Sequence, residues 1–251
     1  MKPGIVRPDC YDPFARVYER HWIETSQSFI PAVALLLLPR LRAGARLLDL
    51  CCGTGSLAAD LQDSDVDVIG LDGSRAMLER AKRTAPGVPF VQGDARRFAL
   101  RPVFDAVVCM FDSLNHMMTP GELGAAFRHV HECLVPGGWF LFDLNTETAY
   151  LRHWNGFHRI VDADMTVMCS SSYDTRSRRG VFELRFETAS EGSVGDTVTL
   201  RQRCHSYPEI SSALERSGLM LTSTYAFEQG ACVSVPAPDA ERVFYLCRRI
   251  S

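Results

Sequence analysis

The segment that most constrains the fold is Leu47–Gly55, an apolar run that ends in an acidic residue and a glycine loop. The run has few breakers, which is typical of a strand buried on both faces, as in a parallel sheet. Gly53 and Gly55 allow a sharp turn and leave no Cβ where a ligand would lie. Residues 56–61 then open a helix. Because open parallel sheets bind ligands beyond the carboxyl ends of their strands, this loop is the first candidate binding site.

The acid in this loop narrows the ligand class. Asp49 disfavours a pyrophosphate and favours a cationic or hydroxyl-rich ligand. S-adenosylmethionine fits, because it carries an ammonium, a sulfonium and ribose hydroxyls. Residues 53–58 also fit the GxGxx(G/A) dinucleotide fingerprint. An NAD(P)-dependent oxidoreductase and a purely structural glycine turn are therefore alternatives at this point.

The same segment resembles a known motif. Asp-Leu-Cys-Cys-Gly-Thr-Gly, residues 49–55, is similar to the first motif of class I S-adenosylmethionine-dependent methyltransferases, with Cys51 where the usual form has glycine. The resemblance implies that this loop holds the cofactor. The cofactor-binding residues it implies here are Asp49, Cys51, Gly53, Thr54 and Gly55.

Two later motifs extend the resemblance. Asp72 is the last residue of an apolar strand. An acidic side chain at this position can accept hydrogen bonds from both ribose hydroxyls of a nucleoside. Residues 72–78 resemble the family's Asp-x-Ser-x-x-Met-Leu stretch, which implies that Met77 lies against the adenine; plain core packing is its alternative role. In the turn formed by Gly93, Asp94 and Ala95, the resemblance implies two hydrogen bonds to adenine. Asp94 would accept one from the adenine amino group, and the Ala95 N–H would donate one to a ring nitrogen.

The exit of the fourth predicted strand is expected beside the transferred methyl group. Residues 104–116 are similar to the family's Phe-Asp-x-Val…Asp-Ser-Leu-Asn-His version of this motif. The resemblance implies that Phe111 contacts the cofactor, that Asn115 and His116 contact the acceptor, and that His116 is a candidate general base. A histidine that only caps the next loop is the alternative. Together with Pro-Gly-Gly at residues 136–138, the motifs span residues 46–145 in the order found in the family. Neither the Gly-Asp-Ala turn nor the Pro-Gly-Gly signature is expected in a dinucleotide-dependent dehydrogenase.

The N-terminal segment resembles the start of the small-molecule branch of the family. Residues 11–18 fit its Tyr-Asp-x-x-Ala-x-x-Tyr pattern. The resemblance implies a helical lid over the cofactor, with Tyr11 or Tyr18 reaching it. A helix simply packed on the body is the alternative.

Hydrophobic patterning predicts the fold class. From residue 46 strands and helices alternate, which predicts an α/β fold with a doubly wound, mostly parallel sheet. The family resemblance implies the seven-stranded, Rossmann-like methyltransferase form of this sheet. After residue 145 the period changes to two, which predicts a three-stranded antiparallel insertion. The predicted parts are an N-terminal helical lid over 1–45, a cofactor-binding core over 46–145, the insertion over 146–207 and the end of the core over 208–251.

The insertion is expected to wall the acceptor site. One strand face carries Arg201, Arg203, His205 and Tyr207, and we expect Arg203 and His205 to contact an anionic or hydroxylated acceptor. A solvated face or a homodimer contact is the alternative.

Composition limits the other partners. A net charge of −3 and a pI near 6.2 argue against a nucleic-acid surface. The first residues lack the apolar core of a signal peptide, residues 30–38 are too few to span a bilayer, and the nine cysteines form no CxxC pair, so no membrane contact and a cytoplasmic location are expected. No metal is predicted, although Asp112, Asp143 and Asn145 offer oxygen ligands for magnesium as a minor alternative.

The prediction for function is transfer of a methyl group from S-adenosylmethionine to a nitrogen or oxygen of a small-molecule acceptor, by in-line displacement. The lid and the insertion resemble those of small-molecule enzymes, including N-methyltransferases of amino sugars. The alternative from another class is a non-catalytic, regulatory S-adenosylmethionine-binding protein.

Overall fold

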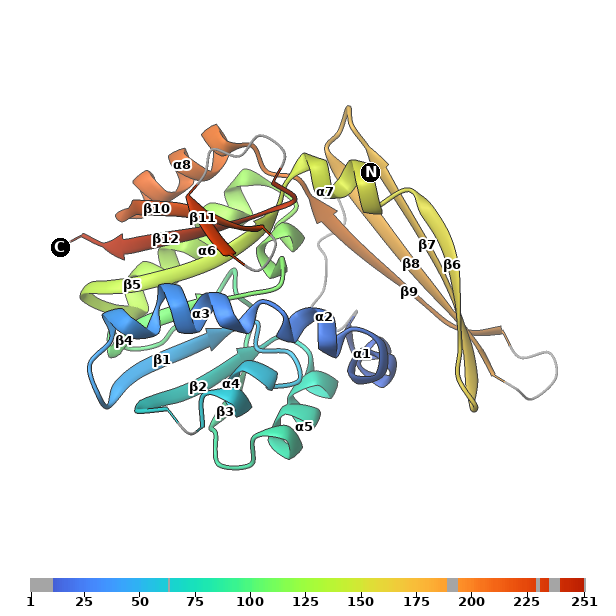
Figure 1. Cartoon of the computed structure of the whole chain (residues 1–251), viewed down its shortest axis with the longest axis horizontal. Helices are drawn as coiled ribbons and strands as arrows, with labels where there is room; N and C mark the ends of the chain where they lie inside the picture. Colours follow the sequence, from blue (N-terminus) through green and yellow to red (C-terminus); the bar gives the residue numbers. More distant parts are fainter. Residues whose placement is uncertain (1–10, 63, 189–193, 229–230, 235–239, 251) are drawn as a thin grey trace.

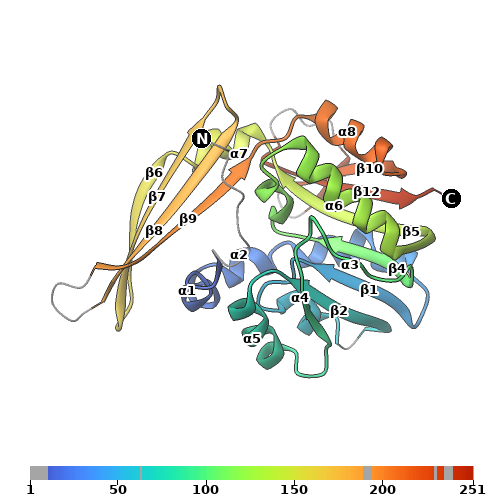
Figure 2. The same ribbon diagram turned by 180° about the vertical axis from the view of Figure 1, so that it is seen from behind.

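The computed structural model describes residues 11–62, 64–188, 194–228, 231–234 and 240–250. It has an α/β body built on an eight-stranded sheet, and a separate four-stranded sheet that projects from one side of the body (Figure 1). The N-terminal helices α1 (Ala15–His21) and α2 (Ile23–Gln27) lie between the two parts in both views (Figures 1 and 2).

The large sheet is doubly wound and mostly parallel, which confirms the predicted fold class. Its strand order is β11-β10-β12-β5-β4-β1-β2-β3. The strands are β1 (Ala45–Leu50), β2 (Val66–Asp72), β3 (Phe90–Gln92), β4 (Phe104–Cys109), β5 (Leu134–Asn145), β10 (Leu219–Glu228), β11 (Ala231–Ser234) and β12 (Arg242–Arg249). The first five are parallel, so their carboxyl ends meet at one edge, whereas the last three pair antiparallel. The short strand β11 is an addition to the seven predicted strands.

Strand β1 is buried on both faces, as its apolar sequence predicts. Leu48 and Leu50 pack in one core cluster with α6 (Pro120–Cys133) and α8 (Tyr207–Arg216). Leu47 packs in a second cluster on the opposite face, with α3 (Ile30–Leu36) and α4 (Ser56–Asp60). The large sheet is therefore the middle layer of three, and helix α3, within the segment predicted as a lid, belongs to the body.

Side chains cap the longer helices of the body. Ser74 accepts a hydrogen bond from the backbone of Met77 at the start of α5 (Arg75–Thr84), and Thr119 does the same for α6. Ser206 and Glu209 form a capping box on α8. Helix α6 ends at Cys133, and β5 begins at the next residue, Leu134, and includes Gly137 and Gly138.

The projecting sheet has four strands, where the sequence pattern predicted three. After α7 (Glu147–His153) come β6 (Gly156–Val161), β7 (Met165–Asp174), β8 (Arg179–Thr188) and β9 (Val194–Arg203), paired antiparallel in that order. Val161, Ala163, Met165, Val167 and Cys169 alternate with other residues, a pattern that predicts one strand. In the structure residues 162–164 turn the chain, and residues 156–161 form a strand of their own.

Helices α1 and α2 and the residues just before them, together called the lid below, contact both the body and the four-stranded sheet. The Asp12 carboxylate accepts hydrogen bonds from the Ser74 hydroxyl and the Ala76 amide at the start of α5. Arg20 pairs with Asp162 and Asp164 in the β6–β7 turn. Phe14 and Val17 pack on the inner face of the four-stranded sheet. Among the described residues, no helix is long and apolar enough to cross a membrane.

Candidate active site

A cavity of about 700 Å³ lies where the carboxyl ends of β1, β2 and β4 meet the lid and the four-stranded sheet. Its wall contains residues of the N-terminal lid, the α/β body and the four-stranded sheet. The glycine loop and the ends of β2 and β4 line one end, and α7, β6 and β8 line the other. The loop predicted from the sequence is therefore one wall of a larger chamber.

The glycine loop is shaped by left-handed backbone conformations and by Asp72. Cys51 and Gly53 have φ angles of 62° and 54°. The Asp72 carboxylate accepts hydrogen bonds from the backbone amides of Gly53 (2.9 Å) and Ser74 (2.8 Å). One side chain thus holds the loop after β1 against the start of α5, and its burial raises the pKa of Asp72.

Two buried polar side chains in this wall have unused hydrogen-bonding atoms. Asp49 is 3% exposed, and its Oδ2 atom has no hydrogen-bond partner among the described residues. The same holds for the Thr54 hydroxyl. Burial, together with the neighbouring Asp72, raises the pKa of Asp49 to about 7. Because unsatisfied buried polar atoms are costly, this wall suits a ligand that brings a cation and hydroxyl groups.

Asp94, Ala95 and Met77 line the cavity next to this wall. The Asp94 carboxylate is held by Arg96, with Nη2 2.7 Å from Oδ2. Although partial burial acts in the opposite direction, the hydrogen bonds from Arg96 lower the pKa of Asp94. Met77 is buried both against the lid and against the cavity, so its two predicted roles, packing and ligand contact, are compatible.

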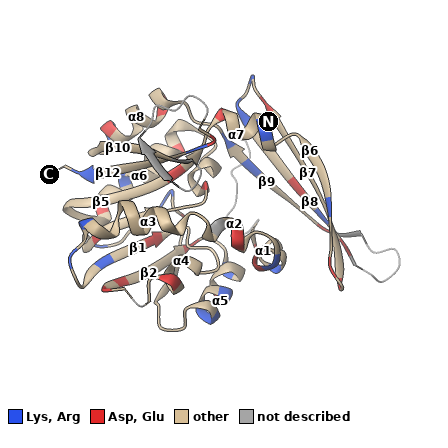
Figure 3. Cartoon of the chain, viewed as in Figure 1, with Lys and Arg blue, Asp and Glu red and all other residues tan. Residues whose placement is uncertain are grey.

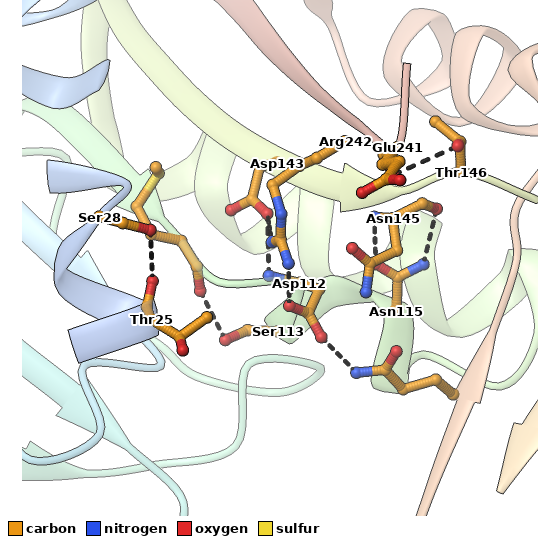
Figure 4. Close-up of polar contacts among 12 residues, drawn as sticks. Thr25, Ser28, Asp112, Ser113, Asn115, Asp143, Asn145, Thr146, Glu241 and Arg242 are labelled. Atoms are coloured by element: carbon orange, nitrogen blue, oxygen red, sulfur yellow. Dashed lines mark hydrogen bonds and ion pairs between the residues drawn. The ribbon is translucent and has the colours of Figure 1, made fainter. Parts of the chain in front are cut away.

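The loop after β4 contains two consecutive residues with positive φ, Phe111 (60°) and Asp112 (49°). Such backbone conformations are unfavourable for residues other than glycine, and they persist only where surrounding contacts fix them. Here the Asp112 amide donates to Asp143 (2.9 Å), and its carboxylate accepts from Arg242 (2.7 Å) and Gln202 (2.5 Å) (Figure 4).

Arg242 is the centre of a buried ion-pair group. Its guanidinium bridges Asp112 and Asp143 (Figure 4). The guanidinium carbon also lies 4.2 Å from the ring centroid of Phe29. Burial opposes its charge, but the two carboxylates raise the pKa of Arg242 above its ordinary value. The carboxylates considered for magnesium are therefore neutralised by arginine, and the described residues contain no group of three or more His, Cys, Asp or Glu side chains placed to hold a metal ion.

His116, at the end of the short helix η3 (Ser113–His116), has a defined tautomer. Its Nδ1 atom lies 2.8 Å from the Arg201 carbonyl oxygen, which can only accept, so Nδ1 carries the proton. Nε2 is then an acceptor, 2.5 Å from the Tyr11 hydroxyl and 3.3 Å from the Gln202 side-chain nitrogen. Burial lowers the pKa of His116, which favours this neutral form. The lid, β9 and the loop after β4 thus meet at one basic nitrogen.

Twelve of the predicted site residues line this cavity. They are Tyr11, Tyr18, Asp49, Cys51, Gly53, Thr54, Asp72, Met77, Asp94, Ala95, Phe111 and His116. Gly55 does not line it: with φ 77° it precedes α4, and a Cβ there would lie 3.0 Å from the Cβ of Ala81. Its lack of a side chain serves the close approach of α4 and α5.

Three predicted acceptor contacts also lie outside the cavity wall, for identifiable reasons. Asn115 is fully buried and bonds the backbone of Asn145 and the Arg203 carbonyl oxygen (2.9 Å). Arg203 pairs with Glu209 on α8 (2.8 Å). His205 is 6% exposed and donates from Nε2 to the Met117 carbonyl oxygen (2.8 Å). These side chains fix loops around the site.

Gln202 is the polar contact that the sequence analysis missed on β9. The prediction used the polar alternates Arg201 and Arg203, whereas Gln202 is on the inner face of the strand, in line with Leu200. A polar residue on the apolar face of an alternating strand was the available signal. Arg242 gave no such signal, because it is only the first residue of an apolar strand.

Comparison with known proteins agrees with this geometry. The methyltransferase domain family matches residues 47–138. A Streptomyces venezuelae protein named dTDP-3-amino-3,4,6-trideoxy-alpha-D-glucopyranose N,N-dimethyltransferase is 40% identical over 106 residues, which are 42% of this chain and 45% of that protein. The matched segment is thus less than half of this relative.

Solved structures match over nearly the whole chain. A S-adenosylmethionine-dependent methyltransferase from Clostridium acetobutylicum superposes with a TM-score of 0.76 at 20% identity, covering 96% of this chain and 100% of that one. A S-adenosylmethionine-bound amino pentose methyltransferase from Micromonospora echinaspora gives 0.66 at 23% identity, covering 95% and 96%. Similarity at this identity shows the fold.

One assignment follows from three observations. They are the family match across the glycine loop and the strand ends, the polar atoms of that wall without hydrogen-bond partners among the described residues, and the shared fold. Residues 47–138 are a methyltransferase domain, and the whole chain has the fold of S-adenosylmethionine-dependent methyltransferases.

Proposed function

We propose that this protein transfers the methyl group of S-adenosylmethionine to the amine nitrogen of a small molecule. The observation that carries the proposal is the neutral His116, whose Nε2 atom meets the Tyr11 hydroxyl inside the cavity. The name of the Streptomyces venezuelae relative, an N,N-dimethyltransferase of an amino sugar, supports nitrogen as the acceptor atom.

The wall around the glycine loop would hold the cofactor. Asp49, whose Oδ2 atom lacks a hydrogen-bond partner among the described residues, would form an ion pair with the ammonium of the methionine part. Asp72 would accept hydrogen bonds from the ribose hydroxyls. Asp94 and the Ala95 amide would meet the adenine, while Tyr18, Met77 and Phe111 would supply apolar contacts. When bound, the cofactor supplies an electrophilic methyl group on a sulfonium.

The chain's own contribution is position and proton transfer. Holding the amine and the methyl group in near-attack alignment can lower the barrier by about 7–11 kcal/mol. An amine that arrives as an ammonium must first lose a proton, because attack needs the nitrogen lone pair. Nε2 of His116 can take that proton, either directly or through the Tyr11 oxygen 2.5 Å away. General-base assistance of this kind typically gives about 10²–10⁴-fold.

The test separates cofactor binding from turnover. Calorimetric titration should show that S-adenosylmethionine and S-adenosylhomocysteine bind and that NAD and ATP do not. The protein is then incubated with S-adenosylmethionine and a panel of amino sugars, other small amines and phenols, and S-adenosylhomocysteine is measured. Release of S-adenosylhomocysteine with amines but not with phenols supports the proposal. Cofactor binding without release from any acceptor would favour the regulatory, non-catalytic alternative.

A further inference from the structure

The part of the cavity wall formed by α7, β6 and β8 contains several aromatic rings. Trp154 follows α7 and stands over Gly180 of β8, where an added Cβ would lie 2.7 Å from the indole. Behind it, the Tyr150 ring lies with its centroid 5.0 Å from that of Trp154. Only glycine leaves room for the indole there, so its position is set by packing.

Two more rings extend this wall. The centroid of Phe182 lies 6.2 Å from that of Trp154, and His158 stacks on Phe182 with ring planes 28° apart. Gly156 and Ser171 are paired across β6 and β7 and line the same cavity, and Ser171 lies opposite Phe182 in the sheet. Among the described residues, and apart from its chain neighbours, no heavy atom lies within 4 Å of the Cβ position of Gly156. The space over Gly156 is therefore open, and we call this space, lined by the same cavity wall as Trp154, His158 and Phe182, the slot.

The charged residues in the described part of the cavity wall are mostly acidic. The wall contains the carboxylates of Asp49, Asp72, Asp94, Asp112 and Glu241, and the guanidiniums of Arg96 and Arg242. Each arginine is already paired: Arg96 with Asp94 and Glu122, and Arg242 with Asp112 and Asp143.

The basic residues near the aromatic part of the wall are also engaged or face elsewhere. Glu241 accepts from both Arg152 (2.9 Å) and His153 (3.0 Å) beside α7. Arginines on β9 are visible in Figure 3, but Arg201 and Arg203 do not line the cavity. Each guanidinium in the described part of the cavity wall is already paired, so an anionic group entering here would have to break an existing pair to gain a cation, whereas a neutral ring would not.

From this geometry we infer that the slot binds a flat, uncharged part of the acceptor, and that the cavity rejects an acceptor carrying a phosphate. The inference rests on the proposed function, because it assumes that the acceptor amine lies near His116. It narrows the substrate class to an amine attached to an aromatic or similarly planar group.

Three probes with one amine test this inference. They are the methyl glycoside, the phenyl glycoside and the anomeric phosphate of the same aminodeoxyglucose. Binding is followed in the presence of S-adenosylhomocysteine by calorimetry, and turnover is followed by release of S-adenosylhomocysteine from S-adenosylmethionine. We expect the phenyl glycoside to bind roughly tenfold more tightly than the methyl glycoside, since stacking adds to the burial of the ring. The anomeric phosphate should bind more weakly than both.

Variants locate the effect. Trp154→Ala and Phe182→Ala should remove the advantage of the phenyl over the methyl glycoside and raise the KM of the phenyl glycoside alone. Trp139→Phe is the matched control, because Trp139 contacts Arg40 and Arg248 and does not line the cavity. If Trp154→Ala unfolds, Trp154→Leu and the Phe182 variant give the same comparison.

The outcomes separate the two proposals. Tight, Trp154-dependent binding of the phenyl glycoside without methyl transfer from any amine supports the slot and contradicts the proposed function. Methylation of all three probes with equal KM supports the function and overturns the slot. Preferred binding of the anomeric phosphate, or no binding of any probe, also overturns it.

Discussion

The Nδ1 atom of His116, on the loop after β4, lies 2.8 Å from the backbone carbonyl oxygen of Arg201 on β9. Further bonds join the same two segments: Gln202 donates to Asp112, and Asn115 donates to the Arg203 carbonyl oxygen. The four-stranded sheet is thus tied to the loop that presents the proposed base. Changes in this sheet should alter the chemistry as well as the acceptor contacts.

His116→Asn should lower kcat by about 10²–10⁴-fold and leave the S-adenosylmethionine Kd nearly unchanged, because it removes only the proton acceptor. Burial lowers the pKa of His116, so in the wild type the rate should fall only when the pH drops below the usual histidine range. There the ring becomes protonated and cannot accept. The kcat–pH profile of the variant should lack this acidic limb; an unchanged profile would assign the limb to another group.

Asp49→Asn should weaken cofactor binding but stabilise the empty protein above neutral pH. The folded-state pKa of Asp49 is about 7, above its unfolded value, so the folded state holds an extra proton and stability declines as pH rises from about 4 to 7. The variant has no such loss, and its advantage should reach a few kcal/mol at pH 8 and vanish at pH 4. Denaturant unfolding at both pH values measures it.

The same carboxyl links cofactor binding to protons. A cation bound beside Asp49 favours its ionised form, so S-adenosylmethionine should release a proton near pH 7. Calorimetry in phosphate and in Tris, whose ionisation enthalpies differ, should report that release for the wild type and not for Asp49→Asn. Identical enthalpies in both buffers would place the ammonium elsewhere.

The glycine loop and the strand ends that line the cavity could be predicted from the sequence because the fold makes these positions local. A parallel strand must end at the binding edge, so Asp49, Asp72 and Asp94 could each be placed from the strand that precedes them. Their order along the chain was enough, without knowledge of distant contacts.

The acceptor side was less predictable because it depends on contacts between distant segments. Period-2 patterning placed the polar alternates of β9 toward the acceptor, yet Gln202 on the apolar face reaches the cavity. Arg242 meets Asp112 across 130 residues, which no local pattern encodes. The turn at residues 162–164 that separates β6 from β7 was hidden by continuous alternation.

Asp72→Asn should weaken S-adenosylmethionine binding tenfold or more, whereas Asp112→Asn should change it less than about twofold. Hydrogen bonds to a charged carboxylate contribute roughly 1.5–3 kcal/mol each, and Asp72 also holds the Gly53 amide. Asp112 instead bonds Arg242 and Gln202. Calorimetric Kd values decide; equal losses would show that the ribose site is misassigned.

Arg242→Met should destabilise the fold by about 3–5 kcal/mol, because it leaves the buried Asp112 and Asp143 carboxylates without their cation. Adding Asp143→Asn to this variant should recover part of the loss, since one buried charge is then removed. Urea unfolding of the two variants gives the comparison. If the double variant is no more stable than Arg242→Met, the arginine stabilises mainly through its contact with Phe29.

His205→Ala should lower kcat and stability rather than raise only the acceptor KM. The His205 Nε2–H donates to the Met117 carbonyl oxygen, one residue beyond the proposed base, so its loss would displace His116. Burial lowers the pKa of His205 to about 4, below its unfolded value near 6.5, so the wild type should lose stability as the pH falls between these values. His205→Gln keeps a donor but cannot titrate. It should therefore restore kcat and still lack this pH-dependent loss, as measured by unfolding at pH 7 and pH 5. If His205→Ala instead raises the acceptor KM at constant kcat and stability, His205 contacts the acceptor directly.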